Sequence, residues 1–360
     1  MRTRRIDKGS LTAARRHRPI NWISDRPRGN DPMIRNPADT AFTRAFGMTV
    51  PIVQAPMGMA SGARLVGAAA EAGALGVLPI WFAPIEVGVE MITATQALTN
   101  RPFAVNIRAD LVMDDMIAAA TDLGVGIVHL FWGDPAASMG AIRRGGARMI
   151  ATVSDAETTH RALDAGAQGL IAQGVEAGGH VLGSTPLKDL LPLVVDLAGD
   201  VPVAAAGGLC DAEDIALVFA LGASAAMLGT RFVAAEESEA HPSYRQALIA
   251  ARAEDTVRTL CFDGGWPDAP HRVLRNSTFR AWEQAGSPAP GARPGEGDVV
   301  MRDRFGTDYV RYHCFPPHMS MDGDLEASTL YAGMGVGKIT DVRPIGALID
   351  EIMEGLSGSR

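Results

Sequence analysis

Short apolar segments alternate with amphipathic, alanine-rich segments from residue 51 onward, and this alternation restricts the fold more than any other feature of the chain. Each apolar segment can be buried on both faces, which is typical of strands in a parallel sheet that is covered on both sides. The intervening segments have the spacing of amphipathic helices. We expect strands at residues 51–56, 74–80, 102–107, 126–133, 148–153, 169–174, 201–208 and 224–231.

Capping residues mark the ends of the helical segments. Ser154 followed by Glu157 predicts a capping box, and Gly166 predicts the end of the same helix.

Eight strand–helix units fit a (β/α)8 TIM barrel and are difficult to place on an open, doubly wound sheet. We therefore predict an α/β protein with this barrel fold.

The regular alternation stops near residue 240. Residues 240–330 concentrate proline, glycine and most of the later aromatic residues, as in "AGSPAPGARPGEGD". This composition predicts an irregular insertion over the catalytic face of the barrel, where it would determine substrate specificity. The predicted parts are a basic leader (1–40), the barrel (41–251), a substrate-lid insertion (252–327), and a C-terminal loop with a closing helix (328–360).

Charge separates the first residues from the rest of the chain. The net charge is −8, yet residues 1–35 hold ten Lys/Arg against three Asp/Glu. This arm has no apolar run like that of a secretory signal, so we expect it to be disordered and dispensable for the barrel. The acidic remainder gives no indication of nucleic-acid binding, and no segment is long and apolar enough for a membrane helix.

The chain has three cysteines, and their wide spacing predicts neither a metal cluster nor a disulfide framework. Together with the charge pattern, this indicates a cytoplasmic protein with no nucleic-acid or membrane partner. The sequence does not indicate the oligomeric state. The cysteines are Cys210, Cys261 and Cys314.

The seventh and eighth predicted strands end in glycine-containing turns. In a TIM barrel, the carboxyl ends of these strands commonly hold a phosphate, because glycines expose backbone N–H groups and a following helix adds its positive dipole end. If only one of the two strands ended in this way, a tight turn would be a sufficient explanation for its glycines. No Walker lysine motif or dinucleotide fingerprint follows a strand, which argues against ATP and dinucleotides. The two pairs are Gly207-Gly208 and Gly229-Thr230.

Amide side chains occur at the ends of the first, third and sixth strands, at Gln54, Asn106 and Gln173. Such groups suit the heteroatom edge of a flat, neutral heterocycle. Flavin mononucleotide (FMN) meets this requirement and that of the phosphate site.

The loop "IAQGVEAGGHVLG" at residues 171–183 places His180 directly after Gly178 and Gly179. Glycines allow the backbone to approach a ligand closely. The histidine would then either contact that ligand or satisfy a backbone carbonyl group. The loop alone does not distinguish these roles.

Several segments together resemble the nitronate monooxygenase family, formerly called 2-nitropropane dioxygenases. The resemblance covers residues 42–250 and 328–356 and includes "PIVQAPMGMASGARLVGAAAEAGALGVLP", "VPVAAAGGLCDAEDIALVFALGASAAMLGTRF" and "YAGMGVG". The most specific element is "AQGVEAGGH". The resemblance implies an FMN-containing TIM barrel that oxidises alkyl nitronates with molecular oxygen to a carbonyl compound and nitrite.

The same resemblance implies roles for individual residues. His180 would be the catalytic histidine, which takes a proton from the carbon next to a nitro group or holds an anionic nitronate. The flavin would be held by Gln54, Ala55, Pro56 and Met57 beneath the ring, by Asn106 and Gln173 at the ring, by Gly178 and Gly179 in the loop, and by Gly207, Gly208, Gly229 and Thr230 at the phosphate.

Two other functions remain open at this point. NAD(P)H-dependent flavin reductases of quinones or enoyl thioesters share the barrel and a similar Gly-Gly-His loop, and they differ in whether a nicotinamide can stack on the flavin. A non-catalytic FMN-binding barrel is the second alternative, against which His180 argues.

Further candidate site residues are Trp266, His271 and Arg272, which would belong to a lid over the pocket, and His129, which would lie in either the core or the pocket.

Overall fold

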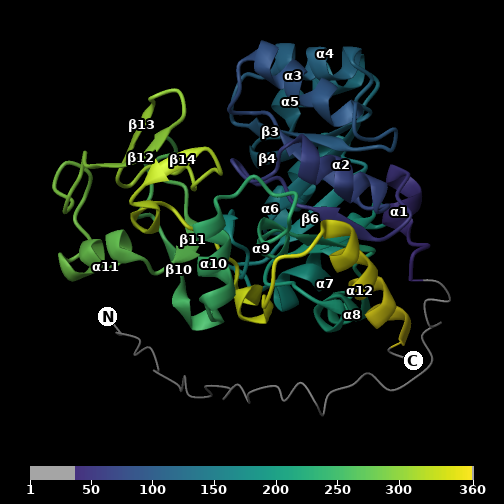
Figure 1. Cartoon of the computed structure of the whole chain (residues 1–360). Coiled ribbons are helices and arrows are strands. Elements are labelled where there is room, and N and C mark those ends of the chain that lie inside the picture. Colours follow the sequence, from purple (N-terminus) through teal and green to yellow (C-terminus); the bar gives the residue numbers. More distant parts are fainter. Residues whose placement is uncertain (1–36, 359–360) are drawn as a thin grey trace, which may run out of the picture. The chain divides into compact units, whose positions relative to one another are not determined.

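The computed structural model describes residues 37–358, and Figure 1 shows how their helices and strands are arranged. Eight parallel strands form a closed barrel, in which the last strand pairs with the first. The predicted α/β TIM barrel is confirmed, with one strand in each predicted segment. The strands are β1 (Ile52–Gln54), β2 (Leu75–Pro79), β3 (Ala104–Ala109), β4 (Ile127–Gly133), β5 (Arg148–Val153), β6 (Gly169–Gln173), β8 (Val203–Ala206) and β9 (Ala225–Leu228).

Helices between the strands cover the outside of the barrel, since their apolar faces pack on the buried strands. The helix that packs on the barrel between α8 and α2 is the last in the chain, α12 (Ile345–Gly358), which follows the insertion in the sequence. The other helices around the strands are α2 (Ala63–Glu71), α3 (Ile85–Gln96), α4 (Asp114–Asp122), α5 (Ala136–Arg144), α6 (Ala156–Asp164), α7 (Leu187–Ala198), α8 (Ala212–Ala220) and the short α9 (Thr230–Val233).

Helix α1 (Ala41–Phe46) closes the amino-terminal end of the barrel. The rings of Phe42 and Phe46 are buried among the inward-facing residues of the strands. A side chain at Gly169 would lie only 2.7 Å from the Phe46 ring, so this close contact requires glycine. The barrel interior is therefore packed at this end, and only the opposite end is available for a ligand.

The capping box of α6 lies one residue later than predicted. Asp155, not Ser154, is the N-cap: its carboxylate accepts from the Thr158 N–H at 2.7 Å, and the Thr158 hydroxyl accepts from the Asp155 N–H at 3.1 Å. Thr158 thus replaces the predicted Glu157 as the second member of the box. Gly166 ends the helix with φ of +84°, as predicted.

The insertion holds more regular structure than its proline and glycine content indicated. One small sheet has the order β10-β11-β7 and another the order β13-β12-β14. Figure 1 shows these sheets and α11 beside the barrel. The elements of the insertion and of the chain on either side of it are α10 (Pro242–Ala250), β10 (Thr256–Thr259), β11 (His271–Leu274), α11 (Ser277–Gln284), β12 (Val299–Asp303), β13 (Asp308–Val310), β14 (Met321–Gly323), and 3-10 helices at Ala253–Asp255, Leu325–Ala327 and Met334–Lys338.

A short strand joins the insertion to the loop after β6. Strand β7 (Gly179–His180) lies in the loop after β6 and pairs antiparallel with β11, with His180 opposite His271. The insertion therefore fixes the backbone of the predicted catalytic loop. The predicted domain boundaries remain a prediction, and the basic leader lies almost entirely outside the described residues. Within the described range, no helix is long and apolar enough to cross a bilayer.

Candidate active site

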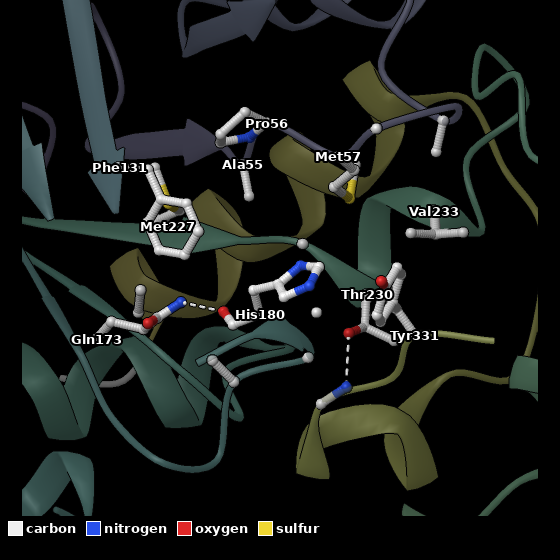
Figure 2. Close-up of a pocket in the computed structure, with 18 of the residues that line it drawn as sticks. Ala55, Pro56, Met57, Phe131, Gln173, His180, Met227, Thr230, Val233 and Tyr331 are labelled. Carbon is white, nitrogen blue, oxygen red and sulfur yellow. Dashed lines mark hydrogen bonds between the residues drawn. The ribbon is translucent and has the colours of Figure 1, made fainter. Parts of the chain in front are cut away.

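A cavity lies at the carboxyl ends of the barrel strands, and Figure 2 shows the His180 imidazole projecting among its lining residues. The structure brings together residues from β1, β3, β6, β8 and β9 that are far apart in the sequence. Every predicted site residue except Gln54 contributes to the wall: Ala55, Pro56, Met57, Asn106, Gln173, Gly178, Gly179, His180, Gly207, Gly208, Gly229 and Thr230.

Gln54 is fully buried and does not line the cavity. Its amide oxygen accepts from the Val77 N–H at 3.2 Å, and its amide nitrogen donates to the Ser61 hydroxyl at 2.8 Å. The Ser61 hydroxyl in turn accepts from the Met57 N–H. Gln54 therefore shapes the turn that carries Ala55–Met57, and the cavity wall is made by the residues after it.

Backbone forms the wall at the ends of β8 and β9. Gly207 and Gly208 have φ of +123° and +71°, values that side chains rarely tolerate. A side chain at Gly208 would also lie 3.1 Å from the Glu176 side chain. On the other side, the Thr230 hydroxyl accepts from the Gly333 N–H at 2.9 Å, a contact drawn in Figure 2.

The same end of the cavity also takes Gly333 and Gly335 from the closing loop. Glycines from three segments thus leave this wall without side chains, so an anionic group can approach the backbone directly. The arrangement fits a phosphate, which favours backbone N–H donors of this kind.

The amide of Gln173 supports the Gly-Gly-His loop. Its nitrogen donates to the His180 carbonyl oxygen at 3.1 Å, and its oxygen accepts from the Leu182 N–H at 3.0 Å. Arg272 holds the same loop from the insertion, because its guanidinium donates to the Val175 carbonyl oxygen at 2.9 Å. Arg272 therefore positions the loop and does not line the cavity.

His129 lies in the wall and is also a hydrogen-bonded core residue. The Asn106 amide nitrogen donates to His129 Nδ1 at 3.1 Å, so Nε2 carries the proton and donates to the Thr152 hydroxyl at 2.8 Å. Burial lowers the pKa of His129 to about 3. This histidine is neutral and satisfied, which argues against a role in proton transfer.

His180 differs from His129 in its hydrogen bonding. Its Nε2 atom is buried and has no hydrogen-bond partner among the described residues. Its ring stacks on Trp266, with centroids 3.9 Å apart, and lies 5.6 Å from the Tyr331 ring. Burial, and then the charges of His271 and Arg108, hold the pKa of His180 well below its usual range. The imidazole is therefore neutral at neutral pH, with a nitrogen that is free to act on a ligand.

Aromatic residues that belong to no recognised sequence motif complete the wall. Trp81 and Phe131 lie at the carboxyl ends of β2 and β4, and Tyr331 comes from the closing loop. Their positions just at or after apolar strands were the available signal. They make the cavity around His180 predominantly apolar, which keeps water from the reacting groups.

His271 is buried and makes two hydrogen bonds that require its neutral form. Nδ1 donates to the Ala269 carbonyl oxygen at 2.9 Å, and Nε2 accepts from the Phe262 N–H at 3.2 Å. Burial lowers its pKa to about 4. His271 is thus a structural residue beside His180.

We expect His271 to make the protein less stable in acid. Its folded-state pKa is depressed, so the unfolded chain binds a proton below pH 6.5 while the folded chain does not until about pH 4. Stability is therefore complete above pH 6.5 and falls by about 3 kcal/mol as the pH drops to 4. Urea midpoints at pH 7, 5.5 and 4.5 should fall more steeply for the wild type than for His271→Leu. Parallel losses would contradict this assignment.

The comparison with protein families decides the identity of the barrel. The model described as nitronate monooxygenase matches residues 39–355. The chain belongs to this family. Family members and the relatives described next are oxidoreductases, and the family and its structural neighbours are flavoproteins.

Two curated relatives illustrate the range of this family. A nitronate monooxygenase of Paraburkholderia phytofirmans is 30% identical, over 71% of this chain and 81% of its own. A (3aS,4S,5R,7aS)-5-hydroxy-7a-methyl-1-oxo-octahydro-1H-indene-4-carboxyl-CoA dehydrogenase of Mycobacterium tuberculosis is 34% identical, over 70% of each chain.

Solved structures show the same range. FabK from Thermotoga maritima has a TM-score of 0.76 and 28% identity, and the match covers 89% of this chain and 96% of that chain. A nitroalkane oxidase from Streptomyces ansochromogenes has a TM-score of 0.71 and 29% identity, over 88% of this chain and 98% of that chain. Family membership therefore establishes a flavin-dependent type of barrel and leaves the substrate to be argued from the site.

Proposed function

We propose that this protein is an FMN-dependent nitronate monooxygenase, which oxidises alkyl nitronates with molecular oxygen to a carbonyl compound and nitrite. The observation that carries the proposal is His180, whose neutral imidazole lies in an apolar cavity with a nitrogen that no group of residues 37–358 hydrogen-bonds. Similarity to the nitronate monooxygenase of Paraburkholderia phytofirmans supports the choice of substrate.

The glycine-lined end of the cavity would hold the phosphate of FMN, at Gly207, Gly208, Gly229 and Thr230. The segment Ala55–Met57, Asn106 and the Gly178–Gly179 backbone would surround its ring. When bound, FMN would supply two-electron redox chemistry and reactivity toward oxygen. The chain itself binds the substrate, excludes water and handles the proton.

His180 would accept the proton from the carbon next to the nitro group of a neutral nitroalkane. Burial keeps its imidazole uncharged and able to accept a proton at neutral pH. The same burial weakens it as a base, but the nitronate formed beside it is an anion and stabilises the imidazolium. A preformed nitronate needs only the positioning that this group provides.

The flavin released from the purified protein should be FMN. The glycine-lined wall suits one phosphate, and the chain has no dinucleotide fingerprint after a strand. Heat release followed by chromatography identifies the chromophore. FAD, or no flavin after reconstitution, would overturn this part of the proposal.

Oxygen consumption with ethylnitronate tests the activity itself. We expect acetaldehyde and nitrite to appear in step with the oxygen consumed by the FMN-loaded protein. Absence of both products, with FMN bound, would refute the proposed reaction.

We also propose a cytoplasmic location, in which the three buried cysteines remain the free thiols that the structure shows.

A second candidate is the oxidation or reduction of a thioester by the same flavin site. Its support is the similarity to the carboxyl-CoA dehydrogenase of Mycobacterium tuberculosis and to FabK. His180 would then exchange a proton next to a thioester carbonyl, which is also a carbon acid. Rapid anaerobic reduction of the flavin by NADH would favour a thioester reductase over the nitronate monooxygenase.

A further inference from the structure

Trp266 lies at the centre of a group of rings over the catalytic half of the cavity. Its indole stacks on His180 on one side, and the Arg108 guanidinium carbon lies 3.5 Å from the indole centroid. The rings of Trp81 and Trp132 meet it edge-on at 5.2 and 5.3 Å. Trp266 thus fills the space between His180 and the ends of β2, β3 and β4.

The indole is held by ring packing and by the cation–π contact with Arg108. Trp266 is 4% exposed, and its Nε1–H has no hydrogen-bond partner in the described part of the chain. A buried tryptophan normally pairs this group, because leaving it unpaired costs stability. A phenylalanine would avoid that cost, so the size of the indole is the property that the site uses.

The loop that carries Trp266 is fixed to residues 312–314 by two backbone hydrogen bonds. The Gly264 N–H donates to the Tyr312 carbonyl oxygen at 3.0 Å, and the Cys314 N–H donates to the Gly264 carbonyl oxygen at 2.8 Å. A side chain at Gly264 would lie 3.0 Å from that Tyr312 oxygen, so the two segments are in close contact. The ring is therefore a fixed wall of the cavity.

We propose that Trp266 determines substrate specificity by limiting the length of the apolar chain that can extend from His180 toward β2–β4. The inference rests on the proposed function, in which the reacting carbon lies beside His180. A substrate with a short alkyl group fits against the indole. A longer group meets the ring and must leave the cavity by another direction or remain in water.

Shortening the side chain should open a pocket beside His180. In Trp266→Ala, the new space is bordered by the rings of Trp81, Trp132 and Phe131 and, on one side, by the Arg108 guanidinium, which is paired with Asp110. The aromatic walls favour an alkyl chain over water, and each methylene that becomes buried contributes about fourfold in binding. The preference of the variant should thus move toward longer chains.

The kinetic test compares ethylnitronate with hexylnitronate on FMN-loaded protein. In Trp266→Ala, the ratio of kcat/KM for hexylnitronate to that for ethylnitronate should rise at least about tenfold over the wild type. Trp266→Phe should give a smaller rise in the same direction. An unchanged ratio in a folded Trp266→Ala variant overturns the proposal, and if that variant fails to fold, an unchanged ratio in Trp266→Phe does so.

Trp282→Ala is the matched control. Trp282 is also in the insertion, but it packs on Phe279, donates its Nε1–H to the Pro288 carbonyl oxygen and does not line the cavity. We expect the wild-type ratio in this variant. A rise equal to that of Trp266→Ala would show that loosening the insertion, and not the wall, changes specificity.

A binding experiment separates this inference from the proposed reaction. Straight-chain carboxylates carry a planar, two-oxygen anion like that of nitronates and do not react. Calorimetric affinities from propanoate to heptanoate should level off early for the wild type and continue to rise in Trp266→Ala. This result would support Trp266 as the limit on chain length even if nitronates prove not to be substrates. Equal chain-length profiles in the two proteins would overturn that role even if nitronates are substrates.

Discussion

His180→Asn is expected to retain FMN while its activity toward neutral nitroethane falls by about 10²–10⁴-fold. The expected ring and phosphate contacts lie on other residues, and Asn keeps the backbone pairing of β7 with β11. The variant lacks the nitrogen that accepts the proton from carbon. Activity toward preformed ethylnitronate should fall less, because this substrate arrives deprotonated and loses only positioning.

Measuring kcat/KM for both substrates on the same preparation removes any general folding defect from the comparison. His160→Asn provides a matched control, because His160 is an exposed histidine on α6. It should behave as the wild type toward both substrates. Equal losses on both substrates in His180→Asn would contradict a role as general base and leave a binding role. Unchanged activity on both would leave His180 with a structural role alone.

Gly208→Val is expected to lower the affinity for FMN on the order of 100-fold, as the loss of one or two hydrogen bonds to a charged group would do. Gly208 has φ of +71°, which valine does not adopt without strain, and a side chain there would crowd Glu176. The backbone would therefore move away from the phosphate. Fluorescence titration of the apoprotein with FMN measures the effect.

Gly124→Val is the matched control for this strain. Gly124 has φ of +85°, is exposed in the turn between α4 and β4, and has no atom within 4 Å of an added Cβ. Both variants should lose similar thermal stability without FMN, and only Gly208→Val should lose FMN affinity. If a folded Gly208→Val protein binds FMN as the wild type does, the phosphate site lies elsewhere.

The barrel was predictable because it depends on local patterns. Strands buried on both faces require uninterrupted apolar residues, and helices between them require an apolar face, so both are visible in sequence. Helix ends were less certain: Asp155 competes with Ser154 as the N-cap, and which of the two side chains reaches the helix N–H groups depends on tertiary packing.

The insertion was predictable only as a region. Its strands are three to five residues long and lack a clear alternation, as in "DYV" and "VVMRD". Their stability comes from pairing with partners distant in the chain, such as β7 with β11. Local sequence patterns do not identify which distant segments pair with each other.

In the candidate site, too, features that depend on one residue type were predictable, and contacts between distant segments were not. Glycines at the strand ends were found because the backbone approach that they permit is a property of the residue type. The sequence predicts a flavin contact for the amide of Gln54. In the structure this amide instead hydrogen-bonds to the Val77 N–H and to the Ser61 hydroxyl, behind the cavity wall. The stacking of Trp266 between His180 and Arg108 joins three segments, and no local pattern predicts it.

Anaerobic mixing of the FMN-loaded protein with ethylnitronate, and separately with NADH, tests the central claim most directly. The apolar cavity with a neutral His180 predicts that ethylnitronate bleaches the flavin absorbance within the turnover time, and that NADH does so far more slowly. Admission of oxygen should then restore the absorbance and release nitrite. Rapid bleaching by NADH with none by ethylnitronate would contradict the proposed function and favour a reductase.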